Sequence, residues 1–271
     1  MDPRLQRRVQ RYGWDKAADH YETHWADQLK PAQELMLDMV EISTGHHVLE
    51  TACGTGLISF PVADTVGSGG RLVGTDISDR MVEICQERAE RDGVRHATFV
   101  QMDAEDLDMP DDQFDVALCG LGLMYVPFPL VAIEEMRRVL KPGGMASTAV
   151  WGKRANCGWA EIFPIVDARV NTDVCPMFYQ LGTGESLKMV FKQAGFQDIR
   201  MERISVELLY EDDDDALGAV FIGGPVAMAV ARFDEATKDE AYGEYLESIK
   251  PYRDGEGYRI PGEFVVVAGT K

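Results

Sequence analysis

The sequence predicts an α/β fold with a Rossmann-like, seven-stranded and mostly parallel sheet that has helices on both faces. Three observations support this prediction. Five short apolar runs lie within the first 151 residues, helix-like segments separate them, and a glycine-containing turn follows the first run. Continuous apolar runs are typical of strands that are buried on both faces of a parallel sheet. Ligands of such sheets bind beyond the carboxyl ends of the strands.

A helical segment of roughly residues 6–41 precedes the first strand. Residues 1–45 are therefore predicted to form an N-terminal helical cover of the sheet. The aromatic and imidazole side chains of this segment are Trp14, His20, Tyr21, His24 and Trp25.

The five apolar runs are the predicted strands, at residues 47–52, 71–76, 98–103, 114–120 and 144–151. After the second run, Ser78 is placed to cap a helix, in which Met81 and Cys85 follow the spacing of one buried face. Before the fifth run, Ile133 and Met136 follow the same pattern until a Lys-Pro-Gly-Gly sequence ends the helix. Strand and helix therefore alternate, as right-handed crossovers require.

The pattern is looser after residue 151. A helix is expected at residues 185–194, an alternating strand at 199–210 and a last, antiparallel strand at 263–269. Residues 210–261 are expected to form a helical insertion before that strand. The acidic run at residues 211–215 is interpreted as the solvated start of a helix.

Composition excludes several kinds of partner. The chain of 271 residues has 27 Lys and Arg against 46 Asp and Glu, a formal net charge of −19. Such a chain lacks the basic surface that nucleic acid or an anionic membrane would require. Its five cysteines are scattered, which favours reduced thiols, and no apolar segment resembles a signal peptide or a membrane span. We therefore expect a cytoplasmic protein.

Carboxylates recur at the ends of three successive predicted strands. Glu50 ends the first, before a turn that contains Gly54 and Gly56, while Asp76 ends the second and Asp103 the third. Glycines let the backbone approach a ligand, and an acid about twenty residues later can accept hydrogen bonds from ribose hydroxyls. The pattern predicts a cleft for a nucleoside.

The same stretch resembles the class I S-adenosylmethionine-dependent methyltransferases, especially the small-molecule group that includes the ubiquinone and menaquinone enzymes. VLETACGTG resembles their first motif, LVGTDIS the second, FVQMDAEDL the third, FDVALCGLGLMYV the fourth and LKPGGMAST the fifth. The order and spacing match over about 100 residues. Segments specific to the quinone enzymes have no counterpart that we recognise in the rest of the chain.

The resemblance implies a role for each part of the chain. Residues 46–151 would be the S-adenosylmethionine-binding core, and residues 152–271 the substrate-side segment, insertion and last strands of the same domain. One departure is Ala52, where the family more often has glycine. The implied cofactor residues are Tyr21, Glu50, Ala52, Gly54, Thr55, Gly56, Asp76, Ile77, Met81, Asp103, Ala104 and Cys119.

An NAD-dependent oxidoreductase is the alternative with a similar turn. The sequence after Gly56 lacks the third glycine of a dinucleotide fingerprint. Glu50 would repel a pyrophosphate, whereas it could attract the ammonium group of S-adenosylmethionine. A non-catalytic partner subunit that keeps the fold is a second alternative.

Candidates for the acceptor side come from three separate segments. Tyr21, His20 and His24 are the predicted catalytic residues, and Trp25, Tyr125, Trp151 and Trp159 the predicted substrate contacts. The aromatic residues could hold a cationic amine through cation–π contacts, or a phenol or quinone in an apolar slot. No metal site is predicted, because the pair His20 and His24 lacks a third ligand.

The predicted function is methyl transfer to a small-molecule acceptor by in-line displacement, with S-adenosylhomocysteine as the product. The enzyme would mainly align donor and acceptor and exclude water. The sequence leaves open the acceptor, its methylated atom and the oligomeric state, for which a homodimer is one option.

Overall fold

The computed structural model describes residues 2–170, 175 and 177–271. Its centre is one sheet with the order β3-β2-β1-β4-β5-β8-β6. Neighbouring strands from β3 to β5 pair in parallel, and β8 is antiparallel to both β5 and β6. The α/β class and the antiparallel last strand are thus confirmed. The strands are β1 (His47–Thr51), β2 (Arg71–Asp76), β3 (Ala97–Gln101), β4 (Phe114–Gly120), β5 (Leu140–Trp151), β6 (Gln197–Tyr210) and β8 (Gly257–Thr270).

The central strands are buried along nearly their whole length, as their unbroken apolar runs predict. In β1 and β2 every residue after the first is buried. In β4 only Asp115 and Gly120 are partly exposed. Strand β8 starts six residues earlier than predicted. It pairs with β6 from Tyr258 to Thr270, and the two-residue strand β7 (Arg253–Asp254) turns back onto its beginning. This hairpin lengthens the sheet beyond the core.

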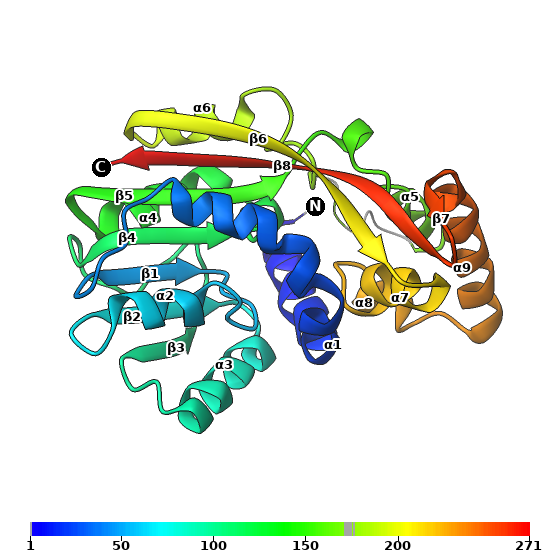
Figure 1. Cartoon of the computed structure of the whole chain (residues 1–271), viewed down its shortest axis with the longest axis horizontal. Helices are drawn as coiled ribbons and strands as arrows, with labels where there is room; N and C mark the ends of the chain where they lie inside the picture. Colours follow the sequence, from blue (N-terminus) through cyan, green and yellow to red (C-terminus); the bar gives the residue numbers. More distant parts are fainter. Residues whose placement is uncertain (1, 171–174, 176) are drawn as a thin grey trace.

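Helices cover both faces of the sheet (Figure 1). One face carries α1 (Pro3–Asp38), α2 (Ser59–Val66) and α3 (Asp79–Asp92), and the other carries α4 (Pro129–Val139) and α6 (Ser186–Gln193). The N-terminal part of helix α1 lies beyond the carboxyl ends of the parallel strands. Its C-terminal part crosses the sheet, and the helix contacts β4, β5, β8 and β6. The predicted N-terminal cover therefore exists as one long helix.

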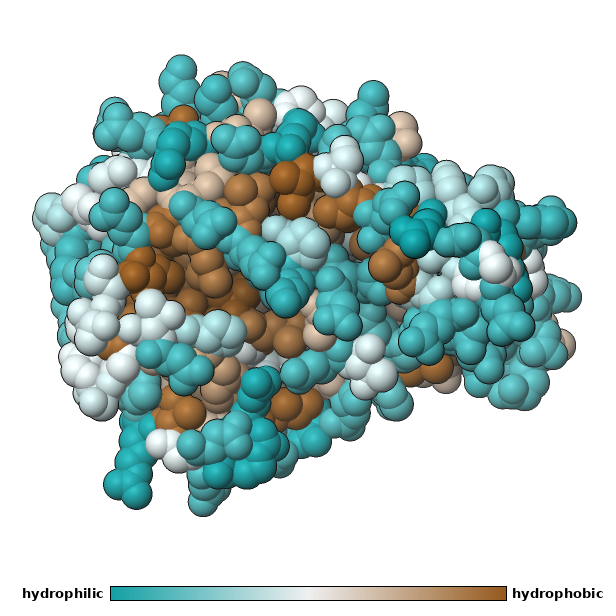
Figure 2. Space-filling model, viewed as in Figure 1, coloured by the Kyte–Doolittle hydropathy of each residue, from teal (hydrophilic) through white to brown (hydrophobic). Residues whose placement is uncertain are grey.

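The expected insertion lies between β6 and β8 and forms the lobe on the right of Figure 1. Its main elements are α7 (Asp213–Leu217), η3 (Gly218–Ile222), α8 (Ala227–Val230), α9 (Glu235–Ile249) and η4 (Lys250–Tyr252). Figure 2 shows that the surface of this lobe is mostly hydrophilic, whereas apolar residues gather on the face that α1 crosses. Smaller elements complete the chain, namely η1 (Leu123–Tyr125), η2 (Arg154–Asn156) and α5 (Ile162–Asp167).

The acidic run starts a helix, as predicted, and no residue in it is fully buried. Asp212 caps α7 by accepting a hydrogen bond from the Asp215 amide at 2.9 Å. Asp213 accepts a hydrogen bond from the Tyr258 hydroxyl at 2.6 Å and pairs with Arg253. Two of the acids therefore hold the insertion together rather than only facing water.

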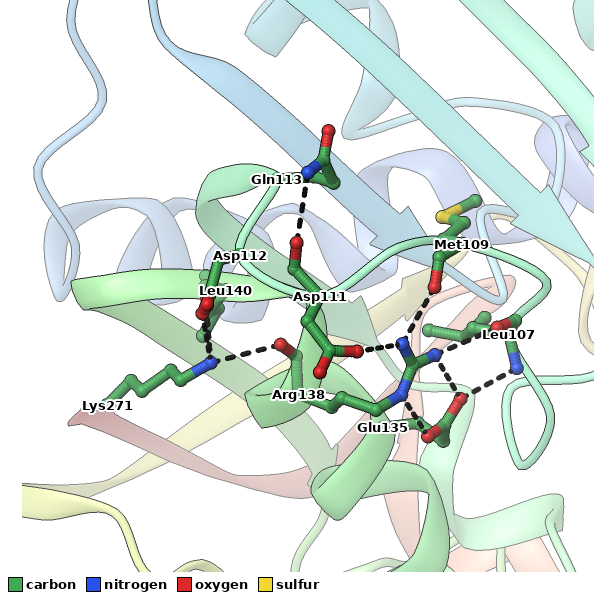
Figure 3. A network of polar contacts seen from close by, with 9 residues as sticks. All are labelled: Leu107, Met109, Asp111, Asp112, Gln113, Glu135, Arg138, Leu140 and Lys271. Carbon is green, nitrogen blue, oxygen red and sulfur yellow. Dashed lines mark hydrogen bonds and ion pairs between the residues drawn. The ribbon is translucent and has the colours of Figure 1, made fainter.

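A polar network fixes the loop that follows β3 (Figure 3). The Arg138 guanidinium donates to Glu135 on its own helix and to the carbonyl oxygens of Met109 and Leu107, at 2.7–2.9 Å. Lys271, the last residue, donates to the carbonyl oxygens of Arg138 and Leu140. Because these bonds satisfy loop carbonyls, they give the loop one conformation beside the sheet.

Among the described residues, no helix is long and apolar enough to span a lipid bilayer. The cytoplasmic location stays a prediction.

Candidate functional site

The turn after β1 brings backbone to the carboxyl edge of the sheet. Gly54 and Gly56 have φ values of 55° and 86°, which glycine adopts without strain. Ala52, with φ of 51°, holds the same left-handed conformation at a steric cost. Its methyl group lies where a side chain of residue 122 would begin, because a Cβ on Gly122 would come within 2.2 Å of the Ala52 Cβ. The turn is therefore packed tightly against the segment after β4.

Asp76 sits at the end of β2 and orders that turn. Its two carboxylate oxygens accept hydrogen bonds from the amides of Gly54 and Ser78, both at 2.9 Å. Burial raises the pKa of Asp76 to about 6, although these amide bonds oppose the shift. Each oxygen keeps a free lone pair. The ionised carboxylate can therefore still accept hydrogen bonds from a ligand.

Asp103, after β3, is bound by the N-terminal helix. The Arg7 guanidinium lies 2.7 Å from Asp103 and also donates to Glu105 at 2.9 Å. Glu105 in turn accepts a hydrogen bond from the Phe128 amide at 2.6 Å. These contacts join the start of α1 to the loops after β3 and β4, at the mouth of the site.

Glu50 lies behind the turn and not on the pocket wall. Its side chain is buried and accepts a hydrogen bond from the Ser59 hydroxyl. Burial, together with the nearby Asp76, raises the pKa of Glu50 to about 8. Glu50 is therefore mostly protonated near pH 7, and the negative charge at this end of the pocket comes from Asp76.

A pocket opens at this edge of the sheet, between the strand ends, α1 and the insertion. One end is made of the turn, Asp76 and the residues after β2 and β3. The other end is aromatic. Most predicted site residues line it: Tyr21, Trp25, Ala52, Gly54, Asp76, Ile77, Met81, Asp103, Ala104, Tyr125, Trp151 and Trp159.

Two tyrosines lie where the two ends meet. Tyr21 comes from α1 and Tyr125 from η1, and both rings pack edge-on against Trp14, with centroid distances of 5.7 and 5.1 Å. Burial raises the pKa of both phenols above 10, so both are neutral hydrogen-bond donors near pH 7. No hydrogen bond is found for either hydroxyl within the described part of the chain.

Three tryptophans form the aromatic end. Trp25, Trp151 and Trp159 contact each other edge to face, with centroids 4.9–6.0 Å apart. The Trp25 indole donates a hydrogen bond to the Ala219 carbonyl at 3.1 Å. This bond ties α1 to the insertion, whose Pro225 also lines the pocket.

The two predicted catalytic histidines do not line the pocket. His20 is exposed on α1. The His24 ring packs against Gly218, and its Nδ1 lies 3.2 Å from Asp215. Both residues lie on the part of the helix that turns toward the insertion. The structure thus gives His24 a packing contact, and it brings neither imidazole to the strand ends.

Thr55, Gly56 and Cys119 also lie behind the pocket wall, together with Glu50. Sequence reasoning missed half of the lining residues, among them Arg7, Gln10, Trp14 and Pro225, and the first three share a helical face with Tyr21. Spacings of three, four and seven residues connect Arg7, Gln10, Trp14 and Tyr21 along α1, so this periodicity could have revealed them. Pro225 had no such signal. In the described residues, no group of three His, Cys, Asp or Glu side chains could hold a metal ion.

Comparison with known proteins identifies the core. Residues 48–144 match the family described as "Methyltransferase domain". Demethylmenaquinone methyltransferase from Staphylococcus carnosus is 33% identical over 120 residues, which are 44% of this chain and 49% of that protein. The chain thus spans about half the length of this relative and of its counterparts from Listeria.

Solved structures extend the likeness to most of the chain. The YcgJ protein from Bacillus subtilis has a TM-score of 0.62 at 18% identity, covering 89% of this chain and 98% of that one. A phosphoethanolamine N-methyltransferase from Haemonchus contortus, in complex with phosphomonomethylethanolamine and S-adenosylhomocysteine, has a TM-score of 0.62 at 17% identity. It covers 95% of this chain and 57% of that one. At such identities these likenesses concern the fold.

Residues 48–144 match a methyltransferase domain, and together with the curated relatives they support a class I S-adenosylmethionine-dependent methyltransferase. The resemblance that the sequence motifs predicted is confirmed.

Proposed function

We propose that this protein binds S-adenosylmethionine and transfers its methyl group to a small-molecule acceptor. The observation that carries the proposal is the pocket at the carboxyl edge of the sheet, where a glycine turn and Asp76 adjoin an aromatic chamber. A nucleoside and a second, apolar molecule could therefore lie end to end in one enclosed space.

The residues at the strand ends fit the cofactor. Gly54 and Gly122 present no side chain to the pocket, so a ligand can approach the backbone. Asp76 would accept hydrogen bonds from the ribose hydroxyls through its free lone pairs. Ile77 and Met81 would contact the adenine. The buried charge of Asp76, whose pKa of about 6 leaves it mainly ionised near pH 7, would favour the positive sulfonium and ammonium groups.

Asp103 would bind the adenine edge, together with the Ala104 backbone. The carboxylate is paired with Arg7 in this structure, at 2.7 Å. A carboxylate has about four acceptor positions, so Arg7 and an amino group could share it. In this arrangement α1 closes over the cofactor and excludes water from the pocket.

When bound, the cofactor would supply an activated methyl group on sulfur. The acceptor would supply the electron pair of the new bond to this methyl group, the sulfur would leave with the pair of its broken bond as S-adenosylhomocysteine, and the proton of the acceptor would pass to the bulk solvent outside the pocket. The residues of the chain orient the two molecules and exclude water, which are the main requirements of such a displacement. Tyr21, at the junction of the two ends, would contact the region of transfer.

An NAD-dependent oxidoreductase fits this site less well. A pyrophosphate would lie beside the ionised carboxylate of Asp76, and like charges in a buried site repel strongly. A partner subunit without catalytic activity would keep the cofactor end but would not need an enclosed aromatic chamber. These two observations favour the enzyme.

Calorimetry of the purified protein tests the proposal. S-adenosylhomocysteine should bind with one site per chain, and NAD should not bind. Acceptor screening for S-adenosylhomocysteine formation, across phenols, amines, thiols and carbon acids, would then identify the reaction. The proposal fails if neither S-adenosylmethionine nor S-adenosylhomocysteine binds.

A further inference from the structure

We infer that the hydroxyls of Tyr21 and Tyr125 together bind an oxygen atom of the methyl acceptor, which makes the acceptor a planar, oxygen-bearing molecule such as a phenol or enol. This inference rests on the proposed function and deepens it. It also decides between the two acceptor classes that the aromatic sequence pattern leaves open, the cationic amines and the phenols.

The first step concerns the two hydroxyls. Tyr21 and Tyr125 come from segments more than a hundred residues apart, yet both line the pocket and both rings pack on Trp14. The two phenols are close enough for Tyr21 to influence the pKa of Tyr125. Neither hydroxyl has a hydrogen-bond partner among the described residues. Two adjacent donors that lack partners are complementary to an oxygen atom with two lone pairs.

The second step concerns protonation. Burial holds both phenols neutral, so neither tyrosine is a base near pH 7 and both remain donors. An ammonium group could meet only the lone pairs of these hydroxyls, whereas an oxygen atom of the acceptor can take up both O–H donors. The donor pair would stabilise an oxygen that gains negative charge as the acceptor loses its proton.

The third step concerns the aromatic end. A cation would need open ring faces or a free carboxylate. The Trp25, Trp151 and Trp159 rings are arranged edge to face with one another, and Phe264 covers a face of Trp151 at a centroid distance of 4.2 Å. Much of their π surface is thus occupied within the cluster.

The carboxylates near this end already bind other groups of the protein or belong to the cofactor end. Glu263 precedes Phe264, the strand partner of Trp151, but its side chain accepts hydrogen bonds from Arg203 and Asn156, at 2.9 and 2.8 Å, and does not line the pocket. Asp76 and Asp103 belong to the cofactor end. The aromatic end therefore suits the uncharged, planar body of a molecule whose oxygen reaches the two tyrosines.

Binding of three probes with one skeleton tests the inference. A naphthol, the matching naphthylamine and the matching naphthylmethylamine, which is a cation near neutral pH, are titrated into the S-adenosylhomocysteine-loaded protein. The naphthol should bind at least about tenfold more tightly than either amine, because a lost hydrogen-bond partner leaves buried donors unpaired. If the cation binds most tightly, or if the naphthol does not bind, the inference is overturned.

Conservative variants test whether the hydroxyls of Tyr21 and Tyr125 cause the preference for the naphthol. Tyr21→Phe and Tyr125→Phe should each weaken naphthol binding about fivefold and leave naphthylamine binding unchanged, since each removes one donor and keeps the ring. Tyr210→Phe is the matched control, because its hydroxyl also lacks a hydrogen-bond partner but is buried outside the pocket. Naphthol affinity should not change in this control.

Affinity for S-adenosylhomocysteine is measured in parallel and separates the two proposals. If the wild type binds the cofactor product but the two Phe variants bind naphthol normally, only the inference about the acceptor is wrong. If the wild type does not bind S-adenosylhomocysteine, the proposed function itself is wrong. Thermal unfolding of each variant checks that the fold is unchanged.

Discussion

The two ends of the pocket are built in opposite ways. The cofactor end comes from a continuous stretch, residues 50–122, in which each ligand-facing group follows a buried strand of the same sheet. The acceptor end joins α1, η1, β5 and the insertion, which are far apart in the sequence. The first end is polar and held by backbone hydrogen bonds, whereas the second is held by ring packing and one indole bond. The sheet thus fixes the cofactor end, and the covering helices determine the acceptor end.

The largest expected effect is on the cofactor end alone. Asp76→Ala removes the proposed ribose ligand and two amide hydrogen bonds, so affinity for S-adenosylhomocysteine should fall by about 100-fold, or roughly 2.7 kcal/mol. Calorimetry measures it. Asp79→Ala, three residues later and exposed, is the matched control and should change affinity less than about twofold. Equal losses in the two variants would contradict the assignment of Asp76.

Glu50, behind the proposed cofactor end, should make the stability of the protein depend on pH. Burial raises its pKa from 4.5 to about 8, so the folded protein keeps a proton that the unfolded chain releases between these values. Stability of the cofactor-free protein should therefore fall as pH rises across this window. Glu50→Gln cannot titrate and should remove about 2 kcal/mol of that fall between about pH 6 and pH 8.

Urea unfolding at a series of pH values measures the difference. Glu41→Gln is the control, because Glu41 is exposed and its substitution should leave the slope unchanged. A wild-type stability that rises with pH across this range, and a Glu50→Gln variant that follows it, would mean that Glu50 is ionised in the folded protein.

Trp25→Phe examines the acceptor end. The variant keeps an aromatic ring but loses the hydrogen bond to Ala219, which should cost about 1 kcal/mol and loosen the insertion from α1. Hydrogen exchange of residues 218–226 should accelerate, while affinity for S-adenosylhomocysteine stays the same. Tyr12→Phe, an exposed position on the same helix, is the control. If Trp25→Phe, but not Tyr12→Phe, lowers the affinity for S-adenosylhomocysteine, the two ends of the pocket are not independent.

The smallest effect is expected at His20. The side chain is exposed and outside the pocket, so His20→Ala should leave the rate of S-adenosylhomocysteine formation within about twofold of the wild type. His24→Ala should lose only the contact with Asp215 and the packing on Gly218. A large loss of turnover in His20→Ala, with an unchanged fold, would restore the general-base hypothesis.

The sequence predicted the cofactor end because local signals there coincide with function. Apolar runs located β1, β2 and β4 almost to the residue, and Asp76 lies at the end of its run. The pairing of Arg7 with Asp103 could not be found in this way, since the two residues lie in different elements and nothing local records their contact. Pro225 lines the pocket only because the insertion folds back onto α1. Such contacts depend on tertiary packing, which the periodicity of one segment does not contain.

The tight contact between Ala52 and Gly122 restricts how this chain can change. Ala52 carries a strained backbone, and its methyl group fills the space that any side chain at residue 122 would need. A substitution of Gly122 by a larger residue is therefore tolerated only after Ala52 has been replaced by glycine. Replacement of Ala52 by glycine would relieve about 1 kcal/mol of strain and open the space, after which residue 122 could become larger. The reverse order passes through a clash, so a substitution that is harmless in a relative with glycine at the first position would be damaging here.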